Sequence, residues 1–513
     1  MFQGVIVWQM SALDIILAAL WLVIILFVAF YGSRYSRGTW MEYIIGGKRF
    51  PWWYVGIAKV SQVNPISPIT TITMISQYGL ISVFSIGYPY GGAKTYFNTR
   101  VYYRTGAITA NQWLDLRFGG KPGAFLRGYN SLHGMFVSGP IGLGMGAKLV
   151  GQAMFQLAGI PDMVWAAIQL YIGAWLLPVV AGMWGITWTS LLLYPLIMVM
   201  YGLLTYFAWT TAGGYQGIVS SFQAWGTPYN LRILGFTEDW PLGMWLGGWA
   251  FALISGWGPM TGWGVLGAKS EDDALVGNTF GTTILSWPNA LIMIPMALAT
   301  MVHFPEIAFP ELAFGKLVRI LLPSGLMGLF VGVWLTPVLI TAQVGRIWQG
   351  GTFANDFYRR LVAPGKSDRH YIWITRISLL GSTALAMMYA YYTYQVVPVM
   401  FWWATLNAGH AIGGLAMYYW WRWGGWIALL TSLVQYPINI VIMNVFEGAY
   451  PVYTLQWIIM VLAWFPAMLL VWILPPSSPD VLMDYYRRTR PPGFWGHIKL
   501  QVEELERAAT SGL

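Results

Sequence analysis

The chain has 513 residues, of which 57% are hydrophobic and 9% are charged, and its mean hydropathy is +0.56. Soluble domains carry about 25% charged residues, so this composition excludes a soluble protein and indicates an all-α integral membrane protein. The net charge is +9, from 28 Lys and Arg against 19 Asp and Glu, and the absence of cysteine excludes disulfides, thiolate catalysis and cysteine-ligated metal centres.

Apolar runs long enough to cross a membrane recur along the chain. A helix needs about 20 apolar residues to span the hydrocarbon core. The first run has no basic leader and no small-residue cleavage site, so we expect a retained span rather than a signal peptide. The sequence predicts thirteen spans, near residues 11–32, 53–78, 80–97, 124–157, 161–182, 186–208, 242–267, 276–301, 321–347, 371–392, 396–420, 424–446 and 452–474.

Basic residues mark alternate connections between these spans. Loops 33–52, 98–123 and 348–370 are rich in Lys and Arg, whereas loops 209–241 and 302–320 have few. Because basic residues accumulate on the cytoplasmic side, we expect the amino terminus outside and the carboxyl terminus inside, in the cytoplasmic (inner) membrane. The positive charge is therefore a topology signal. The expected partners are the lipid bilayer and a small-molecule solute, and not nucleic acid.

One predicted span is interrupted at its middle, where residues 61–70 read SQVNPISPIT. Pro65 and Pro68 have no backbone N–H, so two carbonyls lose their helical partners. In hydrocarbon such backbone persists only where protein, water or a ligand satisfies it. A proline kink satisfied by neighbouring helices is the alternative, but we expect a binding site, because four polar side chains accompany the prolines: Ser61, Gln62, Asn64 and Ser67.

A second interruption follows five spans later. Residues 255–264 read SGWGPMTGWG, with four glycines and Pro259 in the middle of a predicted span. Transporters built from inverted repeats place discontinuous helices at corresponding positions of their two halves. The spacing therefore favours a five-plus-five inverted repeat, with spans two to six matched by spans seven to eleven.

The predicted repeat divides the chain into six parts. They are a peripheral first helix with a cytoplasmic loop (1–52), the first inverted repeat (53–208), an extracellular loop (209–241), the second inverted repeat (242–420), two additional helices (421–474) and a cytoplasmic tail (475–513). The tail is polar, with one expected amphipathic helix near 497–508, and it is too short for an enzymatic domain.

Five stretches resemble one known family in order and spacing. They are YIIGGKRFPWWYVGIAKVSQVNPIS, RTGAITANQWLDLRFGG, GMWGITWTS, LGAKSEDDA and GGTFANDFYRRLVAPGKSDRH. Across roughly residues 12–446 the chain is similar to the sodium:solute symporter family. The resemblance implies a LeuT-type fold, a substrate site between the two broken helices, and alternating access driven by a sodium gradient.

The resemblance also implies where sodium binds. The family's ion site combines backbone carbonyls of the first broken helix with small and hydroxyl residues of the ninth span, and oxygen ligands suit this hard cation. Among the matching positions of the ninth span only Thr341 keeps a hydroxyl, so the site is depleted unless Thr336 or Gln343 compensates in a shifted register. The matching positions are Ser61, Gln62, Pro65, Pro337, Ile340 and Thr341.

Lys59 lies on the cytoplasmic half of the first broken helix. Its ammonium group is a candidate to replace the coupling ion, which would make transport sodium-independent. The alternative is that its long side chain reaches the interface by snorkelling. No acidic residue falls well inside a predicted span, so proton coupling would need one of four groups: Lys59, Lys148, His133 or His410.

Residues beside the two interruptions are the candidates for contact with the solute. Asparagine donates and accepts hydrogen bonds, and tryptophan offers an apolar wall with one donor, although a lipid-facing or core position for the tryptophans is an equal alternative. Apart from Lys59, the sequence has no charged residue near either interruption, which favours a small neutral or zwitterionic solute over a polyanion. The expected contacts are Asn64, Ser67, Trp257, Thr261 and Trp263.

We therefore expect a secondary active transporter with sodium as its coupling ion and no organic cofactor. The alternatives are a sodium-independent exchanger or uniporter, with Lys59 in place of the ion, and a non-transporting subunit or sensor with membrane protein partners. An enzyme is not expected, because the sequence offers no nucleophile, metal or acid–base constellation.

Overall fold

The computed structural model describes residues 10–36, 38–60, 67–85, 98–109, 111–225, 231, 241–246, 263–306, 309–393, 420–446 and 452–511. At some positions inside its helices only the backbone is described. This part of the chain is helical apart from turns and two isolated backbone bridges, Phe50 with Ala268 and Trp420 with Phe494. The predicted all-α class is confirmed.

Helices follow one another in two runs. The first run comprises α1 (Ala12–Ser33), α2 (Trp40–Ile45), α3 (Trp52–Val60), α4 (Ser67–Tyr78), α5 (Ile81–Ser85), α7 (Gln112–Phe118), α8 (Gly120–His133), α9 (Gly139–Ala158), α10 (Asp162–Ile168), α11 (Leu177–Thr211) and α12 (Gly214–Ala224). The second comprises α14 (Trp263–Gly267), α15 (Glu271–Thr279), α16 (Ser286–His303), α17 (Ala313–Leu321), α18 (Leu326–Thr352), α19 (Asp368–Tyr392), α21 (Gly425–Val445), α22 (Val452–Ile473), α23 (Pro479–Thr489) and α24 (Gly496–Ser511).

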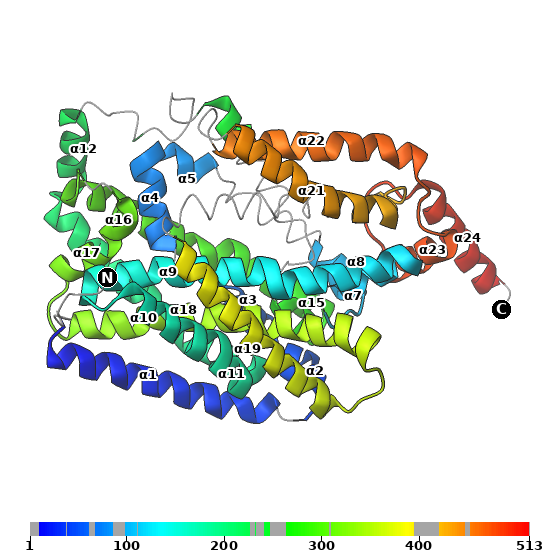
Figure 1. Ribbon diagram of the computed structural model, residues 1–513, viewed down its shortest axis with the longest axis horizontal. Helices are drawn as coiled ribbons and strands as arrows, with labels where there is room; N and C mark the ends of the chain where they lie inside the picture. The colour runs from blue at the N-terminus through cyan, green and yellow to red at the C-terminus, as the bar shows by residue number, and fades with distance from the viewer. Residues whose placement is uncertain are drawn as a thin grey trace.

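Short π-helical segments join several consecutive helices without a turn. They are η3 (Gly134–Ser138), η4 (Gln169–Leu176) and η6 (Phe280–Leu285), whereas η8 (Phe353–Val362) extends α18 and is followed by a turn. Figure 1 shows most long helices running in one common direction, with α1 along one side, the α21 and α22 pair along the other, and α23 and α24 at one end. Helices that share one direction in this way are expected of a bundle that crosses a bilayer, with the helix axes running through the membrane.

Four described stretches are individually long and apolar enough to cross a membrane: Ala12–Ser36, Asp162–Thr211, Asp368–Tyr392 and Gly425–Ile442. Other predicted spans are divided between elements, as 53–78 is between α3 and α4, and 276–301 is among α15, η6 and α16. Residues 396–419 of the predicted span 396–420 and most of 80–97 lie outside the described residues. The number thirteen therefore stays a prediction.

The boundary predicted between spans 161–182 and 186–208 is a kink at Gly182. Its φ of +58° lies in the left-handed region that favours glycine. A Cβ atom there would lie 2.8 Å from the Cβ atom of Ser36, so a side chain would also collide with the segment after α1. Glycine at this position lets the chain turn between the two predicted spans, although both sides of the kink belong to α11.

Two stretches predicted as loops are largely helical. The ninth span was predicted to end at residue 347, but α18 continues to Thr352 and then through η8 to Val362. Loop 302–320 likewise contains most of α17. These loop predictions are wrong because polar side chains lower the hydropathy of a helix without ending it, so hydropathy reports depth in the bilayer rather than helix length.

The carboxyl-terminal tail is better ordered than a polar tail suggests. The predicted helix near 497–508 is confirmed as α24, and α23 precedes it without having been predicted. The Arg117 side chain of α7 is fully buried and lies over the rings of Tyr485 and Trp495, at 5.6 and 5.1 Å from their centroids. Its Nη2 donates to the carbonyl oxygen of Trp420 at 2.9 Å. These contacts hold the tail against the turn before α21.

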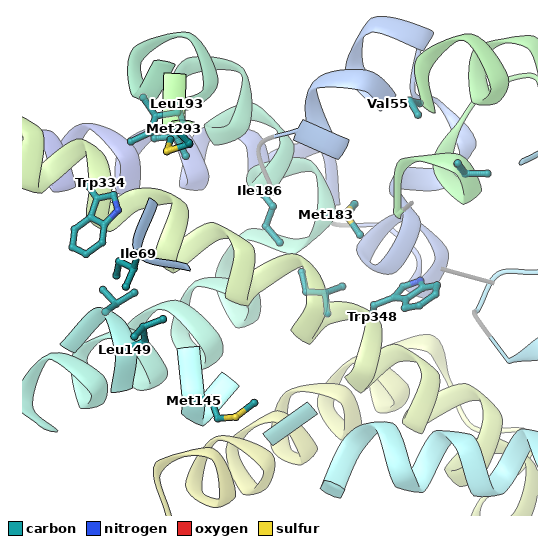
Figure 2. Close-up of a cluster of buried hydrophobic side chains, with 14 of the residues drawn as sticks. Val55, Ile69, Met145, Leu149, Met183, Ile186, Leu193, Met293, Trp334 and Trp348 are labelled. Atoms are coloured by element: carbon teal, nitrogen blue, oxygen red, sulfur yellow. The ribbon is translucent and has the colours of Figure 1, made fainter. Parts of the chain in front are cut away.

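The hydrophobic core has α18 near its centre. Figure 2 shows Trp334 and Trp348 of α18 with Leu149 of α9, Ile186 of α11 and Ile69 of α4, all of them buried. Because these residues come from helices far apart in sequence, the core ties the two predicted repeats together.

Helix α1 is held on α18 by glycines and by one carboxylate. A Cβ atom on Gly328 would lie 2.2 Å from the Cα atom of Asp14, so the helices approach as closely as their backbones allow. The buried Asp14 carboxylate accepts from the backbone N–H groups of Gly325 at 2.7 Å and Gly328 at 2.8 Å, and from Ser11 at 3.0 Å. One carboxylate therefore caps the amino ends of both α1 and α18.

We expect Asp14→Ala to lower the stability of the protein. The substitution removes two caps and leaves buried N–H donors without an acceptor, which costs about 2 kcal/mol or more. Thermal unfolding of the purified protein in detergent measures the effect. Asp272→Ala is the matched control, because Asp272 also lies in the first turn of a helix but is exposed. Equal midpoints for the two variants would contradict the double-cap role.

Candidate functional site

The first predicted interruption falls between two separate helices. Helix α3 ends at Val60 and α4 begins at Ser67, with residues 61–66 outside the description. Pro68 is the second residue of α4 and is buried. Ser67 is half-buried at the start of α4, and its carbonyl accepts from the Thr70 hydroxyl at 3.2 Å.

The second predicted interruption is described only at its end. Helix α14 begins at Trp263, and residues 247–262 lie outside the description. Helix α14 is short and is followed at once by α15, whose first turn carries three acidic residues. The flanks of both interruptions can therefore be placed, although most of the interrupted residues cannot.

Those flanks lie against each other. A Cβ atom on Gly264 of α14 would lie 3.1 Å from the Cα atom of Val55 in α3, and one on Gly277 of α15 would lie 2.3 Å from the carbonyl oxygen of Trp52. Glycine at these positions lets the helix backbones touch. The site predicted from the two interruptions required them to be neighbours, and the described flanks meet that requirement.

The chain just before α3 pairs with the chain just after α14. The backbone N–H of Phe50 donates to Gly267 at 2.9 Å, and that of Lys269 donates to Phe50 at 3.0 Å. The Asp273 carboxylate accepts from the backbone N–H of Trp52 at 2.8 Å, which caps the amino end of α3. Corresponding parts of the two predicted repeats are thus fixed to each other by backbone hydrogen bonds.

Most of the predicted site residues cannot be placed. Seven lie outside the described residues: Ser61, Gln62, Asn64, Pro65, Trp257, Thr261 and His410. Five more are in described helices, but nothing is described of their side chains: Lys59 in α3, Trp263 in α14, and Pro337, Ile340 and Thr341 in α18. Their roles in binding the solute or sodium remain predictions.

Three other candidates have identified neighbours. Lys148 of α9 forms an ion pair with Asp162, the first residue of α10, at 2.5 Å, which places it beside a helix end. The His133 ring stacks on that of Tyr129 within α8. Thr336 accepts from the indole N–H of Trp21 at 2.7 Å and donates to Gly332 at 2.9 Å. The Thr336 hydroxyl is therefore engaged with α1.

A buried arginine was missed by the sequence analysis. Arg346 lies near the predicted end of the ninth span, but within α18 it is fully buried. The guanidinium has five N–H donors, and five neutral oxygens accept from it: Ala174 O, Gln349 Oε1, Leu379 O, Ser382 Oγ and Thr383 Oγ1, at 2.6 to 3.3 Å. These acceptors belong to η4, α18 and α19, so Arg346 joins three elements.

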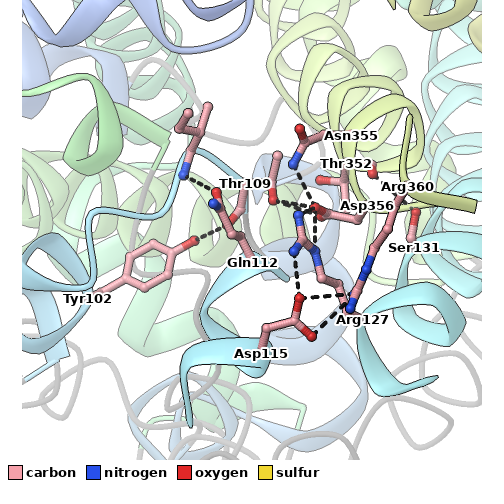
Figure 3. Close-up of polar contacts among 11 residues, drawn as sticks. Tyr102, Thr109, Gln112, Asp115, Arg127, Ser131, Thr352, Asn355, Asp356 and Arg360 are labelled. Carbon is pink, nitrogen blue, oxygen red and sulfur yellow. Dashed lines mark hydrogen bonds and ion pairs between the residues drawn. The ribbon is translucent and has the colours of Figure 1, made fainter. Parts of the chain in front are cut away.

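A second missed cluster surrounds Asp356 in η8 (Figure 3). Its carboxylate is fully buried and accepts from Arg127 Nε at 2.8 Å, from the Thr109 hydroxyl at 2.7 Å and from Asn355 Nδ2 at 2.8 Å. Burial raises the pKa of Asp356, and the Arg127 guanidinium opposes this shift. The acidic residue was overlooked because residues 348–370 were predicted as a loop.

The cluster extends to a second carboxylate. Asp115 of α7 pairs with Arg127 at 2.6 Å and with Arg360 at 3.0 Å. Arg127 therefore bridges two carboxylates, and Figure 3 shows its guanidinium between them. We call Thr109, Asp115, Arg127, Asp356 and Arg360 the arginine cluster. It joins the segment before α8 to the end of α18.

Residues 98–118, which include Thr109 and Asp115 of the arginine cluster, are also fixed to α15. Arg104 donates two hydrogen bonds to Glu271, from Nε at 2.8 Å and from Nη2 at 2.7 Å. The Asn278 amide donates to the Thr99 hydroxyl at 2.8 Å, and both residues are buried. Residues 98–118 thus connect α15, which packs on α3, with α8 and η8, which continue into the core helices.

Comparison with known proteins agrees with this geometry. The sequence model of the Sodium:solute symporter family matches residues 43–425. None of the proteins with a curated function matches the chain. Among solved structures, a Na⁺-coupled sialic acid symporter in a substrate-bound outward-open state is similar, with a TM-score of 0.74 and 16% identity over 91% of this chain and 99% of that chain.

A second solved structure supports the same fold. MHP1, a nucleobase-cation-symport-1 family transporter in a closed conformation, has a TM-score of 0.53 and 15% identity over 86% of this chain and 97% of that chain. These likenesses confirm the predicted LeuT-type fold. The family match covers most of the chain and includes the flanks of both interruptions. This protein therefore belongs to the sodium:solute symporter family of secondary active transporters.

Proposed function

We propose that this transporter moves a small neutral or zwitterionic solute together with sodium, through a site lined by its two interrupted segments. The observation that carries the proposal is the contact of α3 with α14 and α15, which brings the flanks of both segments together in one place. Asn64 and Ser67 on one side, with Trp257, Thr261 and Trp263 on the other, are the residues we propose for the solute.

Sodium coupling is supported by the family and by the two similar structures, one of a Na⁺-coupled symporter and the other of a nucleobase–cation symporter. We place the ion between the carbonyls of Ser61, Gln62 and Pro65 and the α18 positions Pro337, Ile340 and Thr341. Because Thr341 is the one hydroxyl among these α18 positions, it supplies the key side-chain oxygen.

Alternating access then requires the helices around the interruptions to move against the core helices. The arginine cluster lies at that boundary, since residues 98–118 are fixed to α15 by Glu271 and to η8 by Asp356. We propose that the cluster holds the cytoplasmic end closed in the outward-facing state. Breaking it would favour the inward-open state.

The basic loops support the orientation in the membrane. The arginine cluster and the tail lie at the end of the molecule that carries loops 98–123 and 348–370. By the positive-inside rule we place this end in the cytoplasm and the amino terminus outside, with the chain in the cytoplasmic membrane. The six-part division predicted from the sequence fits this orientation.

The first prediction concerns sodium. Uptake of a transported solute into vesicles should fall to background when external sodium is replaced by choline. Thr341→Val keeps the size of the side chain but removes the hydroxyl, and it should raise the sodium concentration for half-maximal uptake about tenfold, as expected for one lost oxygen ligand. Thr510→Val, in the tail, is the control. Uptake that is equal in sodium and choline would sink the coupling proposal.

The second prediction separates sodium coupling from its rival, in which Lys59 replaces the ion. If the Lys59 ammonium reaches the interface, Lys59→Met should leave both the uptake rate and its sodium dependence unchanged, because the charge lies outside the site. Sodium-dependent initial rates in vesicles check this. If the wild type takes up the solute without sodium and Lys59→Met requires sodium, Lys59 replaces the ion and the rival mechanism is established.

The third prediction uses the absence of cysteine from the chain. In a Ser67→Cys background, labelling by a membrane-impermeant maleimide from the cytoplasmic side reports access to the interruption. Asp356→Asn should raise this rate several-fold, because a neutral amide cannot hold Arg127 as a carboxylate does. Asp484→Asn, which affects an exposed ion pair with Arg488, should leave it unchanged. Equal rates in all three proteins would remove the arginine cluster from the gating mechanism.

A further inference from the structure

Arg376 is a charged side chain inside a predicted span that the transport mechanism does not use. It lies two turns into α19 (Asp368–Tyr392), is half-buried, and has no carboxylate partner in the described part of the chain. Its guanidinium stands over the rings of Trp373, at 5.2 Å, and Tyr43, at 5.6 Å. Its Nε is covered and has no acceptor among the residues that the structure describes. An arginine at this depth needs an anion or a path to the headgroups.

The surroundings of Arg376 form a seam between three elements. Tyr43 belongs to α2, and its hydroxyl donates to the carbonyl of Pro178 in α11 at 2.7 Å. Asp368, the nearest acid on α19, accepts from the backbone N–H of Trp40 at 3.1 Å, so it is engaged with the amino end of α2. Arg376 donates to the Tyr43 hydroxyl. The seam therefore joins α2, α11 and α19, and among the described residues it gives Arg376 a hydroxyl but no carboxylate.

Basic and apolar side chains are segregated along this seam. Arg369 and Arg376 are seven residues apart, hence on one face of α19, and Arg369 is exposed at the start of the helix. Deeper in the span, α19 exposes Ile377 and Leu380. Leu176 at the end of η4 and Val180 of α11 are also exposed, one turn apart. Charge at the headgroup level with apolar surface below it matches the two ends of a phospholipid.

We propose that this seam binds an anionic phospholipid, with its phosphodiester between Arg369 and Arg376 and its acyl chains along the exposed apolar residues of η4, α11 and α19. A helical side chain leans toward the amino end of its helix, which directs the Arg376 guanidinium toward the headgroup layer. Arginine donates two parallel hydrogen bonds to phosphate oxygens. Trp373, 49% exposed, is placed where tryptophan favours the interface.

The charge balance favours an anionic headgroup over a zwitterionic one. Glu42 is paired with Arg49 at 2.7 Å, and Asp368 caps α2, so the acids around the seam are engaged. Arg369 and Arg376 carry two positive charges against the one negative charge of Asp368, so the seam keeps a net positive charge. A choline group would meet these cations, whereas the glycerol of phosphatidylglycerol would not.

The test is native mass spectrometry of the full-length protein, delipidated in detergent and titrated with phosphatidylglycerol. Wild type should retain one lipid that Arg376→Gln binds about tenfold more weakly, the factor expected for one lost charge-assisted contact. Arg422→Gln is the matched control. Arg422 also stacks on a tryptophan, Trp472 at 4.6 Å, but its Nε is satisfied by the Val471 carbonyl at 3.1 Å. It should bind lipid as wild type does.

A second measurement identifies the source of the phosphate. Phosphatidylglycerol should raise the thermal unfolding midpoint of wild type and of Tyr43→Phe, which keeps the ring beneath the guanidinium, but not that of Arg376→Gln. Equal retention of phosphatidylglycerol by wild type and Arg376→Gln would overturn the proposal. So would equal retention of phosphatidylcholine, or a midpoint raised as much by inorganic phosphate alone.

Discussion

Backbone N–H and C=O groups that enter hydrocarbon must find partners inside the protein, and this constraint shapes the whole chain. Where the helices are continuous, each satisfies its own backbone. Where they are interrupted, the neighbouring element must come close enough to help. Glycine at Gly264 and Gly277 permits that approach between α3, α14 and α15, and the paired backbone of Phe50 and Gly267 completes it. The transport site proposed here depends on this contact.

The same constraint governs the charged side chains. Arg346 is fully buried, yet five neutral oxygens accept its five N–H groups. The buried carboxylate of Asp14 is satisfied largely by backbone N–H groups at two helix ends. Charge is thus held in the interior by hydrogen bonds, and it fixes the position of α18 against its neighbours. A fixed α18 suits a helix that supplies one half of the proposed ion site.

At the end of the molecule that we place in the cytoplasm, opposite charges meet directly. The arginine cluster and the Arg104–Glu271 pair both involve residues 98–118, which join the elements around the interruptions to the core helices. Ion pairs with several partners can be exchanged one at a time, which suits a boundary that must open and close. Arg376 differs from these groups, because in the described part of the chain its charge has no carboxylate partner.

The sequence by itself determined the membrane class, the interruptions, and the family, because hydropathy, paired prolines and motif order are local properties of the chain. It placed a boundary between spans near residue 182 and a helix in the tail for the same reason, but not the kink at Gly182 by which α11 continues across that boundary. It missed Arg346 and Asp356, since hydropathy could not show that α18 continues to Val362 or which helices surround it. Only the tertiary structure decided which flanks touch and which charges are paired, because those contacts join residues that are hundreds of positions apart and depend on close helix packing.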